Sequence, residues 1–254
     1  MPNKYVIHKD GNPVEVVAPG ISFIIPARNE AEGIGRTIEY ILKQPEHLVK
    51  EIIVADNGST DRTREIASGY PKTRVISVPT PGTNRARQAG VDASSGEIVA
   101  FLDADNWPTA NWSATAIHYL KKPGVVAVAG IYDYRDMNEF SRYLSILGFL
   151  VISYPVYLLV HYILKRGSVV QGGNLAVRRE ALEKIGGLDV NYTFFGDDVK
   201  TGKQLRKIGR VIFAPDLIVR SSARRFRKHG YVKTIFRYFI NFAWVILFDR
   251  PFTK

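Results

Sequence analysis

The chain has 254 residues and contains no cysteine. This absence excludes thiolate metal sites, cysteine nucleophiles, redox-active cysteine pairs and disulfide scaffolds, and it fits a reducing compartment. Residues 1–10 contain no long apolar run, so we expect no signal peptide. There is no repeat or low-complexity stretch, and 46% of the residues are hydrophobic, which excludes disordered and collagen-like chains. The length suits one α/β domain, alone or with an appendage.

Acidic residues are scarce in the last fifth of the chain. Residues 199–254 hold 14 Lys and Arg but only two acidic residues, Asp216 and Asp249. The formal net charge of the whole chain is +11, so its positive charge resides in this segment. Such a segment attracts phosphates on nucleic acid, on anionic lipids or on a charged substrate.

Short apolar runs alternate with amphipathic stretches along the chain. The apolar runs predict strands at residues 21–25, 51–56, 74–78, 98–103, 125–131, 169–178, 211–214 and 217–219. The stretches between them predict helices over residues 30–44, from about Asp61 with Ser59 or Thr60 as its N-cap, over 83–93, and up to 208 after a loop at 194. This alternation predicts an α/β fold with a mainly parallel sheet.

Polar side chains follow the carboxyl ends of several predicted strands. They are Arg28, Asn29, Glu30, Asp56, Asn57, Asp103 and Asp105. Ligands of open α/β sheets bind beyond the carboxyl ends of the strands. We therefore expect these side chains to line one edge of the sheet and to form a ligand site.

Two aspartates in this set have the spacing of a metal site. Asp103 and Asp105 follow a buried strand, and residues i and i+2 of an extended chain point the same way. Hard cations such as Mg²⁺ or Mn²⁺ prefer oxygen ligands and commonly bridge to substrate phosphates. The alternative is a turn or helix cap made from two aspartates.

Four motifs occur in a characteristic order, at residues 24–30 (IIPARNE), 54–61 (VADNGSTD), 86–90 (ARQAG) and 100–105 (AFLDAD). Together they resemble the family-2 glycosyltransferases with the GT-A fold, over roughly residues 20–215. The resemblance implies a Rossmann-like, mainly parallel sheet flanked by helices. It also implies inverting transfer of a sugar from a nucleotide-diphosphate sugar to a hydroxyl or phosphate acceptor, assisted by Mg²⁺ or Mn²⁺.

The resemblance assigns donor-side roles to individual residues. Pro26, Ala27, Arg28 and Glu30 would hold the nucleoside, and Asp56 would accept a hydrogen bond from the base, which favours a UDP-sugar. Arg87 would lie near the phosphates or sugar, Asp103 and Ala104 would contact the ribose or sugar side, and Asp105 together with Asp103 would bind the metal. The alternatives are a surface ion pair for Arg28 and Glu30, a turn former at Asp56 and a solvated helix residue at Arg87.

The resemblance continues in the second half. Gly172, Gly173 and Asn174 would pack under the donor sugar and the acceptor; the alternative for the glycines is a bulge or turn. Asp197 and Asp198 match the Glu-Asp pair of the family, with Asp198 as the catalytic base; Asp197, which replaces the usual Glu, is the other candidate, and a helix cap is the alternative for both. Arg224 and Arg225 would close over the diphosphate, and His229 is a further candidate metal ligand. The Gln-x-x-Arg-Trp motif of processive synthases is absent, which favours transfer of a single sugar.

Residues 143–164 form an apolar segment without Asp, Glu, Lys or Arg, long enough to cross a membrane. A single crossing is excluded if carboxylates on both sides of it share one site, so we expect an interfacial, re-entrant or buried segment. Residues 231–248 predict an interfacial anchor. We therefore expect a catalytic domain over 1–222 with an apolar helical insertion at about 139–166, and a membrane-association segment over 223–254. The protein would act at the cytoplasmic side of a membrane, peripheral or monotopic, on a lipid- or polyprenyl-linked acceptor. The alternative is a soluble acceptor, with both segments used in a homodimer.

Two other classes of protein are considered. Sugar-phosphate nucleotidyltransferases resemble the GT-A fold but usually carry a Gly-rich basic signature where this chain has residues 26–30. A basic nucleic-acid-binding module would leave the acidic cluster unexplained, because carboxylates repel phosphate backbones. We therefore expect no nucleic-acid partner.

Overall fold

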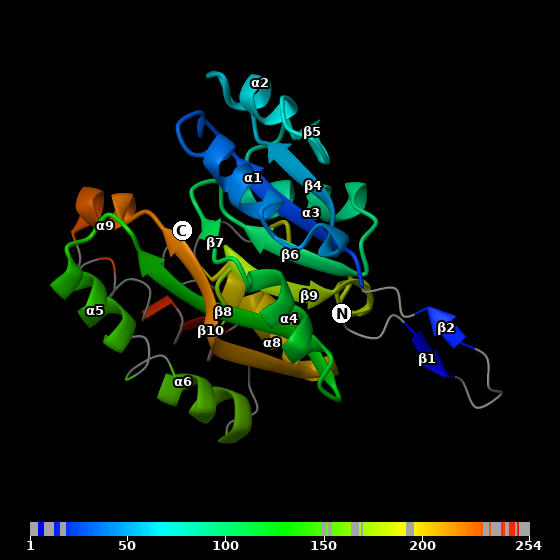
Figure 1. The fold of residues 1–254 in the computed structure, drawn as a ribbon. Helices are drawn as coiled ribbons and strands as arrows, with labels where there is room; N and C mark the ends of the chain where they lie inside the picture. The colour runs from blue at the N-terminus through cyan, green and yellow to red at the C-terminus, as the bar shows by residue number, and fades with distance from the viewer. Residues whose placement is uncertain are drawn as a thin grey trace.

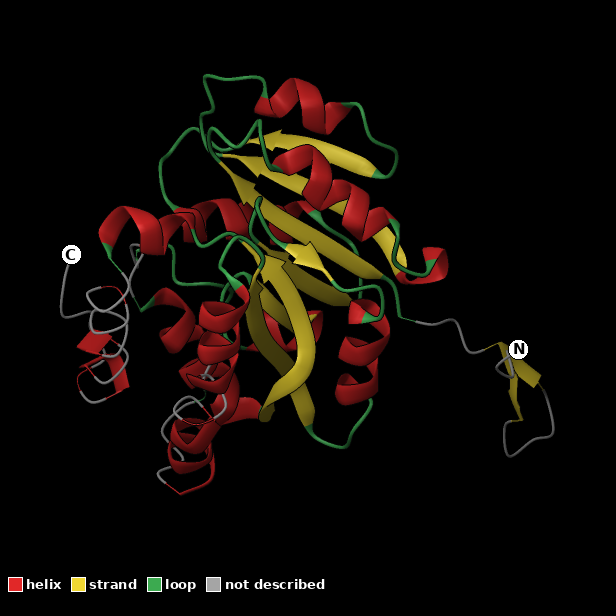
Figure 2. Cartoon of the chain, turned by 60° about the vertical axis from the view of Figure 1, so that its left-hand side comes forward, coloured by secondary structure: helices red, strands yellow, loops and turns green. Residues whose placement is uncertain are grey.

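The computed structural model describes residues 5–7, 13–15, 19–148, 151, 154–163, 168, 170–191, 196–230, 234, 240–241, 244–246 and 248. An eight-stranded sheet carries helices on both faces, which confirms the predicted α/β fold (Figures 1 and 2). A separate hairpin of β1 (Tyr5–Ile7) and β2 (Pro13–Glu15) stands away from this body at the N-terminal end (Figure 1).

The strand order in the sheet is β5-β4-β3-β6-β9-β8-β10-β7. In that order the strands are β5 (Thr73–Ser77), β4 (Val49–Asp56), β3 (Ile21–Ala27), β6 (Ile98–Leu102), β9 (Asn174–Arg178), β8 (Val125–Tyr134), β10 (Arg210–Ser221) and β7 (Trp107–Pro108). The first four are parallel, as is the pair β8 and β10. The residues predicted as two short strands at 211–214 and 217–219 form one strand, β10, with a register shift between Phe213 and Ile218.

The mainly parallel pattern is broken at β9, which runs antiparallel to both β6 and β8. Leu102, the last residue of β6, pairs with Asn174, the first residue of β9. The residues that precede β9 therefore lie at the same edge as the residues that follow β6. This reversal brings the two glycines at 172–173 beside Asp103.

Alternate residues of the central strands pack on opposite faces, as the period of a strand requires. Phe23 and Ile25 pack with α1 (Ile34–Leu42), α2 (Thr63–Ser68) and α4 (Trp112–Leu120). On the other face Ile24 packs with α3 (Thr83–Ala93), α7 (Arg179–Lys184) and α8 (Asp197–Ile208). Strands that are buried on both faces appear in the sequence as continuous apolar runs, which is why they could be predicted. The helices α4 and α7 were not predicted.

The described residues of the apolar segment predicted at 143–164 lie in several helical elements. The segment contributes to α5 (Glu139–Gly148), α6 (Tyr154–Leu158) and a short π-helix, η3 (Leu159–Ile163). Within the described ranges no helix is long and apolar enough to cross a membrane. Figure 1 shows α5, α6 and α9 (Arg224–His229) grouped beside β8 and β10. Most of the anchor predicted at 231–248 lies outside the described residues.

Candidate active site

The loops after β3 and β4 are tied together by side chains that were predicted to cap α2. Asn29 has a φ of 54°, a left-handed conformation that asparagine tolerates. The side-chain Oδ1 of Asn29 accepts a hydrogen bond from the backbone amide of Thr60 at 2.8 Å. The backbone amide of Asn29 donates to Ser59 Oγ at 3.0 Å. The cap prediction was wrong, because the N-cap of α2 is Arg62. Ser59 and Thr60 instead fix the loop that carries Glu30.

The predicted nucleoside-side residues lie at the ends of β3 and β4. Pro26 and Ala27 are the last two residues of β3, and the Ala27 carbonyl accepts from the Asn57 amide at 2.8 Å. Arg28 is exposed at the rim. Asp56 is buried at the end of β4, where Oδ1 accepts from the Ser59 amide at 3.3 Å. These strand ends therefore stand side by side, as the sequence predicted.

Arg224 from α9 lies beside two carboxylates at this edge, those of Glu30 and Asp105. Its Nη2 lies 2.8 Å from Glu30 Oε1 and 3.8 Å from Asp105 Oδ2. Glu30 therefore pairs with Arg224, and the surface pair of Arg28 with Glu30 is not formed. Ala104 lies beneath, buried, with its carbonyl accepting from Thr37 Oγ1 at 2.7 Å. The side chains of Arg225 and His229 are outside the described part of the structure.

Asp103 and Asp105 form a partly exposed pair of carboxylates, with side chains 39% and 23% exposed. Burial, the charge of Asp103 and the charge of Glu30 together raise the pKa of Asp105 to about 6, although Arg224 and Arg135 act in the opposite direction. Burial and the two acidic neighbours therefore disfavour the negative charge of ionised Asp105. A cation bound at this edge would relieve that charge.

The two carboxylates fit a divalent cation whose remaining ligands come from the substrate and from water. In the described part of the chain, no group of three or more His, Asp or Glu side chains is placed to hold a metal unaided. Mg²⁺ is usually bound by one or two carboxylates together with waters and substrate phosphates. Asp105 and Asp103 meet that requirement, because both supply partly exposed carboxylates at the same edge of the sheet.

Arg87 on α3 joins this pair to a second pair of carboxylates. Its Nη2 lies 3.0 Å from Asp103 Oδ1, and its Nη1 lies 3.1 Å from Asp197 Oδ2. Arg87 is buried; burial opposes its charge, but the two carboxylates outweigh that effect and raise its pKa further. The alternative of a solvated helix residue is therefore excluded. Arg87 links the end of β6 to the start of α8.

Asp197 and Asp198 begin α8, and their surroundings differ. Asp197 is buried against Arg87, whereas Asp198 Oδ2 accepts from the Gly172 amide at 3.4 Å. Burial raises the pKa of both carboxyl groups, and for Asp197 the neighbouring charge of Asp198 adds to the effect. The N-cap position belongs to Gly196, with no side-chain cap, so neither aspartate serves as the cap.

Gly172 and Gly173 separate the two carboxylate pairs, and each position has room only for a hydrogen atom. A Cβ on Gly172 would lie 2.6 Å from Arg87 Nη1. A Cβ on Gly173 would lie 2.2 Å from Asp103 Oδ2 and 2.7 Å from the hydroxyl of Tyr132. Glycine is therefore required for the backbone to approach the charged groups this closely.

Asn174 does not reach the site. It is fully buried, and its Nδ2 donates to the carbonyls of Ile131 and Leu217, both at 2.9 Å. Its Oδ1 accepts from Trp112 Nε1 at 2.8 Å. The prediction that Asn174 packs under the sugar is corrected accordingly: its amide ties β9 to β8, β10 and α4.

Sequence reasoning missed two residues at the end of β8. Burial, followed by the charge of Asp103, raises the pKa of Tyr132 well above its usual value, so its hydroxyl stays a neutral hydrogen-bond donor beside Gly173. Arg135 Nη1 donates to the Asp105 carbonyl at 2.8 Å, and its guanidinium lies 3.7 Å from the ring centroid of Trp107. The strand was predicted to end at 131, so polar residues just beyond it were not counted as strand-end residues.

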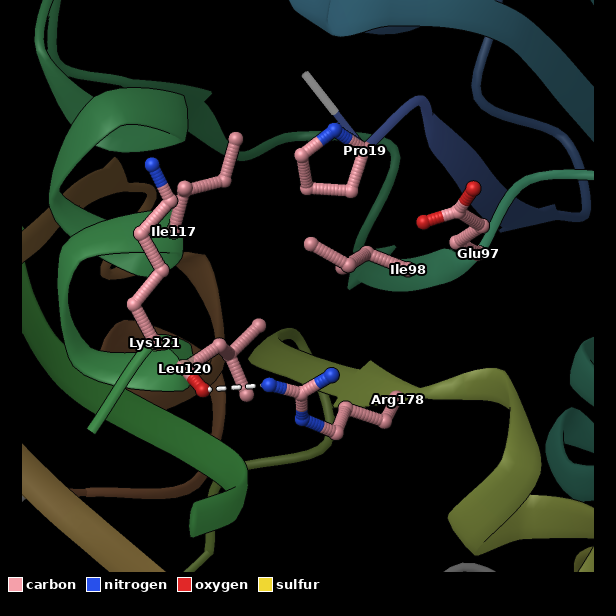
Figure 3. A pocket seen from close by; sticks show the side chains of 7 residues that line it. All are labelled: Pro19, Glu97, Ile98, Ile117, Leu120, Lys121 and Arg178. Carbon is pink, nitrogen blue, oxygen red and sulfur yellow. Dashed lines mark hydrogen bonds between the residues drawn. The ribbon is translucent and has the colours of Figure 1, made fainter. Parts of the chain in front are cut away.

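The described structure has one small cavity far from the site and one beside it. One of about 40 Å³ lies at the opposite end of the sheet, near the starts of β3 and β6, where Arg178 Nη2 donates to the Leu120 carbonyl (Figure 3). The other, of about 10 Å³, is lined by Arg87, Gly172 and Asp198 among others. Enclosed ligand pockets of drug size measure roughly 300–1,000 Å³. Neither cavity can hold a nucleotide sugar, so the strand-end carboxylates define the candidate site.

Two carboxylate pairs and two arginines thus converge at the strand ends of an α/β sheet, where ligands of such folds bind. The chain belongs to the family described as Glycosyl transferase family 2, whose sequence profile matches residues 22–186. It is therefore a glycosyltransferase, as the motifs predicted.

Two named glycosyltransferases illustrate the relationship. Glycosyltransferase AglE of Haloferax volcanii is 31% identical over 218 residues, which cover 82% of this chain and 68% of that protein. The uncharacterized glycosyltransferase alr2836 of Nostoc sp. is 31% identical over 186 residues, covering 70% of this chain and 56% of its own. The second match spans little more than half of that relative, so this chain corresponds to only part of it.

Solved structures establish the fold. The mannosyltransferase PcManGT from Pyrobaculum calidifontis, solved with GDP-Man and Mn²⁺, superposes with a TM-score of 0.67 at 24% identity, covering 93% of this chain and 68% of that one. Glucosyl-3-phosphoglycerate synthase from Mycobacterium tuberculosis, solved with Mn²⁺, UDP and glucosyl-3-phosphoglycerate, gives 0.59 at 24% identity, covering 90% and 80%. The GT-A fold is thereby confirmed.

Proposed function

We propose that this glycosyltransferase moves a single sugar from a nucleoside-diphosphate sugar to a hydroxyl or phosphate acceptor with inversion at the anomeric carbon. The observation that carries the proposal is the double ion pair of Arg87, which holds Asp103 and Asp197 at 3.0 and 3.1 Å. The group that neutralises the leaving diphosphate of the donor and the group that takes the proton of the acceptor must act at one reaction centre, and Arg87 joins the two.

The reaction breaks the bond between the anomeric carbon and the diphosphate oxygen, and that oxygen leaves with the electron pair. Asp105 and Asp103 would hold a divalent cation, which when bound supplies positive charge to the leaving diphosphate. Arg224, now facing Glu30 and Asp105, is placed to contact the same phosphates with its forked guanidinium. The charge that develops on the leaving group is thereby stabilised.

Asp198 is the proposed base. One oxygen of Asp197 is paired with Arg87, whereas among the described residues Asp198 accepts hydrogen bonds from the backbone amides of Gly172 and Val199. A raised carboxyl pKa strengthens proton acceptance near neutral pH, and a general base typically contributes about 10²–10⁴-fold in rate. With a hydroxyl acceptor, Asp198 takes the proton while the acceptor oxygen bonds to the sugar; an ionised phosphate acceptor has no such proton to lose and attacks directly. A single displacement of this kind inverts the anomeric centre.

UDP is the proposed donor nucleotide, because Asp56 occupies the position of a base-contacting residue at the end of β4. The two structural neighbours differ here, since one was solved with GDP-Man and the other with UDP. A thermal-shift comparison of UDP and GDP, each with and without Mn²⁺, tests the choice. We expect Mn²⁺-dependent stabilisation by UDP that exceeds that by GDP; the reverse order would assign a guanosine donor.

The proposed acceptor is lipid-linked, such as a polyprenyl phosphate, reached from the cytoplasmic side by a peripheral or monotopic protein. Support comes from the apolar run at 143–164 and from the basic tail. The second candidate is a small phosphorylated acceptor, because one neighbour was solved with phosphoglyceric acid. Mass spectrometry of reactions with UDP-sugars and either acceptor decides: glycosylated polyprenyl phosphate is expected, and product from phosphoglyceric acid alone would overturn the lipid acceptor.

A further inference from the structure

Helix α5 presents its apolar residues outward. Phe140, Tyr143, Leu144 and Leu147 follow the i, i+3, i+4, i+7 spacing of one helical face, and their exposed fractions are 72%, 64%, 45% and 40%. Ser145, a polar residue, is buried. A surface helix usually turns its apolar stripe toward the core, so this helix has the opposite orientation.

The segment that follows α5 is also two-sided. Val156 and Val160 pack inward against Val199 and the C-terminal pair Val245 and Ile246. On the outer side, large apolar residues of the same segment remain exposed: Val151, Tyr154, Leu158, Leu159, Tyr162 and Ile163. We call these six, together with the four outward residues of α5, the outer apolar face. A concentration of exposed large apolar residues in one stretch of the chain is typical of an interaction site.

Positive charge borders the outer apolar face at both ends. Arg227 on α9 pairs at 2.7 Å with Asp136, which lies just before α5. At the other end Arg206 Nε donates to the His161 carbonyl of η3 at 3.3 Å. Residues 140–163 contain no Asp or Glu. The carboxylates next to this stretch are Asp136, which pairs with Arg227, and Glu139 at the start of α5.

We infer that the outer apolar face inserts into the headgroup region of an anionic lipid bilayer, with the flanking arginines on the lipid phosphates. Three tyrosines in the face suit this depth, because their rings are apolar and their hydroxyls remain wet. The inference rests on the proposed lipid-linked acceptor. Helix α5 follows β8, whose end carries Tyr132 of the site (Figure 1). Docking would therefore bring the end of β8, which borders the site, toward the membrane surface.

Flotation with vesicles tests the inference. The full chain is mixed with vesicles of phosphatidylcholine, alone or with phosphatidylglycerol, and the bound fraction is measured. We expect binding that phosphatidylglycerol strengthens, and that drops about 100-fold in partition when Phe140, Leu144 and Leu147 are all replaced by Ser. A matched pair of single variants is Leu147→Ser and Val190→Ser: the two residues are 40% and 37% exposed, but Val190 lies in the loop near α3. Only Leu147→Ser should weaken flotation.

The outcomes separate docking from catalysis. All variants should keep the wild-type urea unfolding midpoint and the UDP-dependent thermal shift, because none touches the site. Equal flotation of the triple variant and wild type would overturn the inference, as would a wild-type chain that does not bind either vesicle. A dimer by sedimentation that the triple variant converts to a monomer, without vesicle binding, would assign the face to a second copy. Failure of the proposed function would instead appear as absent sugar transfer in a chain that floats normally.

Discussion

The two carboxylate pairs consist of the same residue type, yet the fold places them in different surroundings. Asp103 and Asp105 follow β6 at a partly open edge, where Arg224 approaches from the outside. Asp197 and Asp198 begin α8, where Asp197 is buried against Arg87. The open pair can share a cation with phosphates, whereas the enclosed pair can hold or release a proton. Environment, rather than residue type, separates the two roles.

Arg87 is the link between the pairs, so its removal should have the largest effect. Arg87→Leu leaves Asp197 buried without its cation, and breaking a buried pair from one side costs about 3–5 kcal/mol. The free energy of unfolding from urea titration at neutral pH measures this loss. The deficit should shrink toward about pH 5, because protonation removes the uncompensated charge of Asp197.

The control for Arg87→Leu is Arg85→Leu on the same helix, which removes a half-buried arginine that holds neither pair together. We expect its unfolding free energy to change by no more than about 0.5 kcal/mol. If both variants unfold alike, Arg87 does not stabilise the site and the two pairs are independent.

Asp198→Asn should break the enclosed pair in a different way. We expect sugar transfer to fall by about 10²–10⁴-fold while UDP with Mn²⁺ still raises the melting temperature, because the donor side is intact. In the wild type, transfer should decrease as the pH falls through the raised pKa of the carboxyl, since the protonated form cannot accept a proton. Asp92→Asn, at an exposed position on α3, serves as the control. Persistent transfer by Asp198→Asn with loss in Asp197→Asn would reverse the base assignment.

The donor half of the site was predictable because its residues follow buried strands. Apolar runs located the ends of β3, β4 and β6, and parallel strands bring such ends to one edge. The sequence also placed Gly172 and Gly173 near the site, although the reversal of β9 that puts them beside Asp103 was not predicted. Motifs read along the chain were therefore enough for this half.

The remaining features depend on packing that no local pattern encodes. Asn174 belongs to a motif, yet its side-chain amide donates to backbone carbonyls of β8 and β10, which come from distant segments of the chain. The sequence predicted that this strand ends at residue 131, but β8 extends to Tyr134. The extension places Tyr132 at the site. The spacing of α5 predicts an apolar face but cannot say that this face turns outward.

Gly173→Ala probes the spacing between the pairs. The added Cβ would lie 2.2 Å from Asp103 Oδ2, so the carboxylate must move away from Arg87, and such overpacking costs about 1–3 kcal/mol. Urea unfolding measures the stability, and the UDP-dependent thermal shift with Mn²⁺ should weaken in parallel. Gly148→Ala is the control, because nothing lies within 4 Å of its added Cβ. An unchanged Gly173→Ala variant would mean that Asp103 need not be held beside Arg87.

Asp105→Asn should have the smallest effect on stability and the opposite sign. The folded pKa of about 6 exceeds the ordinary value of 3.8, so ionisation of Asp105 destabilises the metal-free fold above that pH. Replacing the carboxylate should therefore stabilise the protein by about 1–2 kcal/mol at pH 8 with a chelator present, after allowance for partial exposure. At a pH below about 4 the wild-type group is protonated in both states, and the difference should vanish. Asp103→Asn, which removes a partner of Arg87, should instead destabilise at pH 8. If both variants shift stability in the same direction, the open pair does not consist of one paired and one unsatisfied carboxylate.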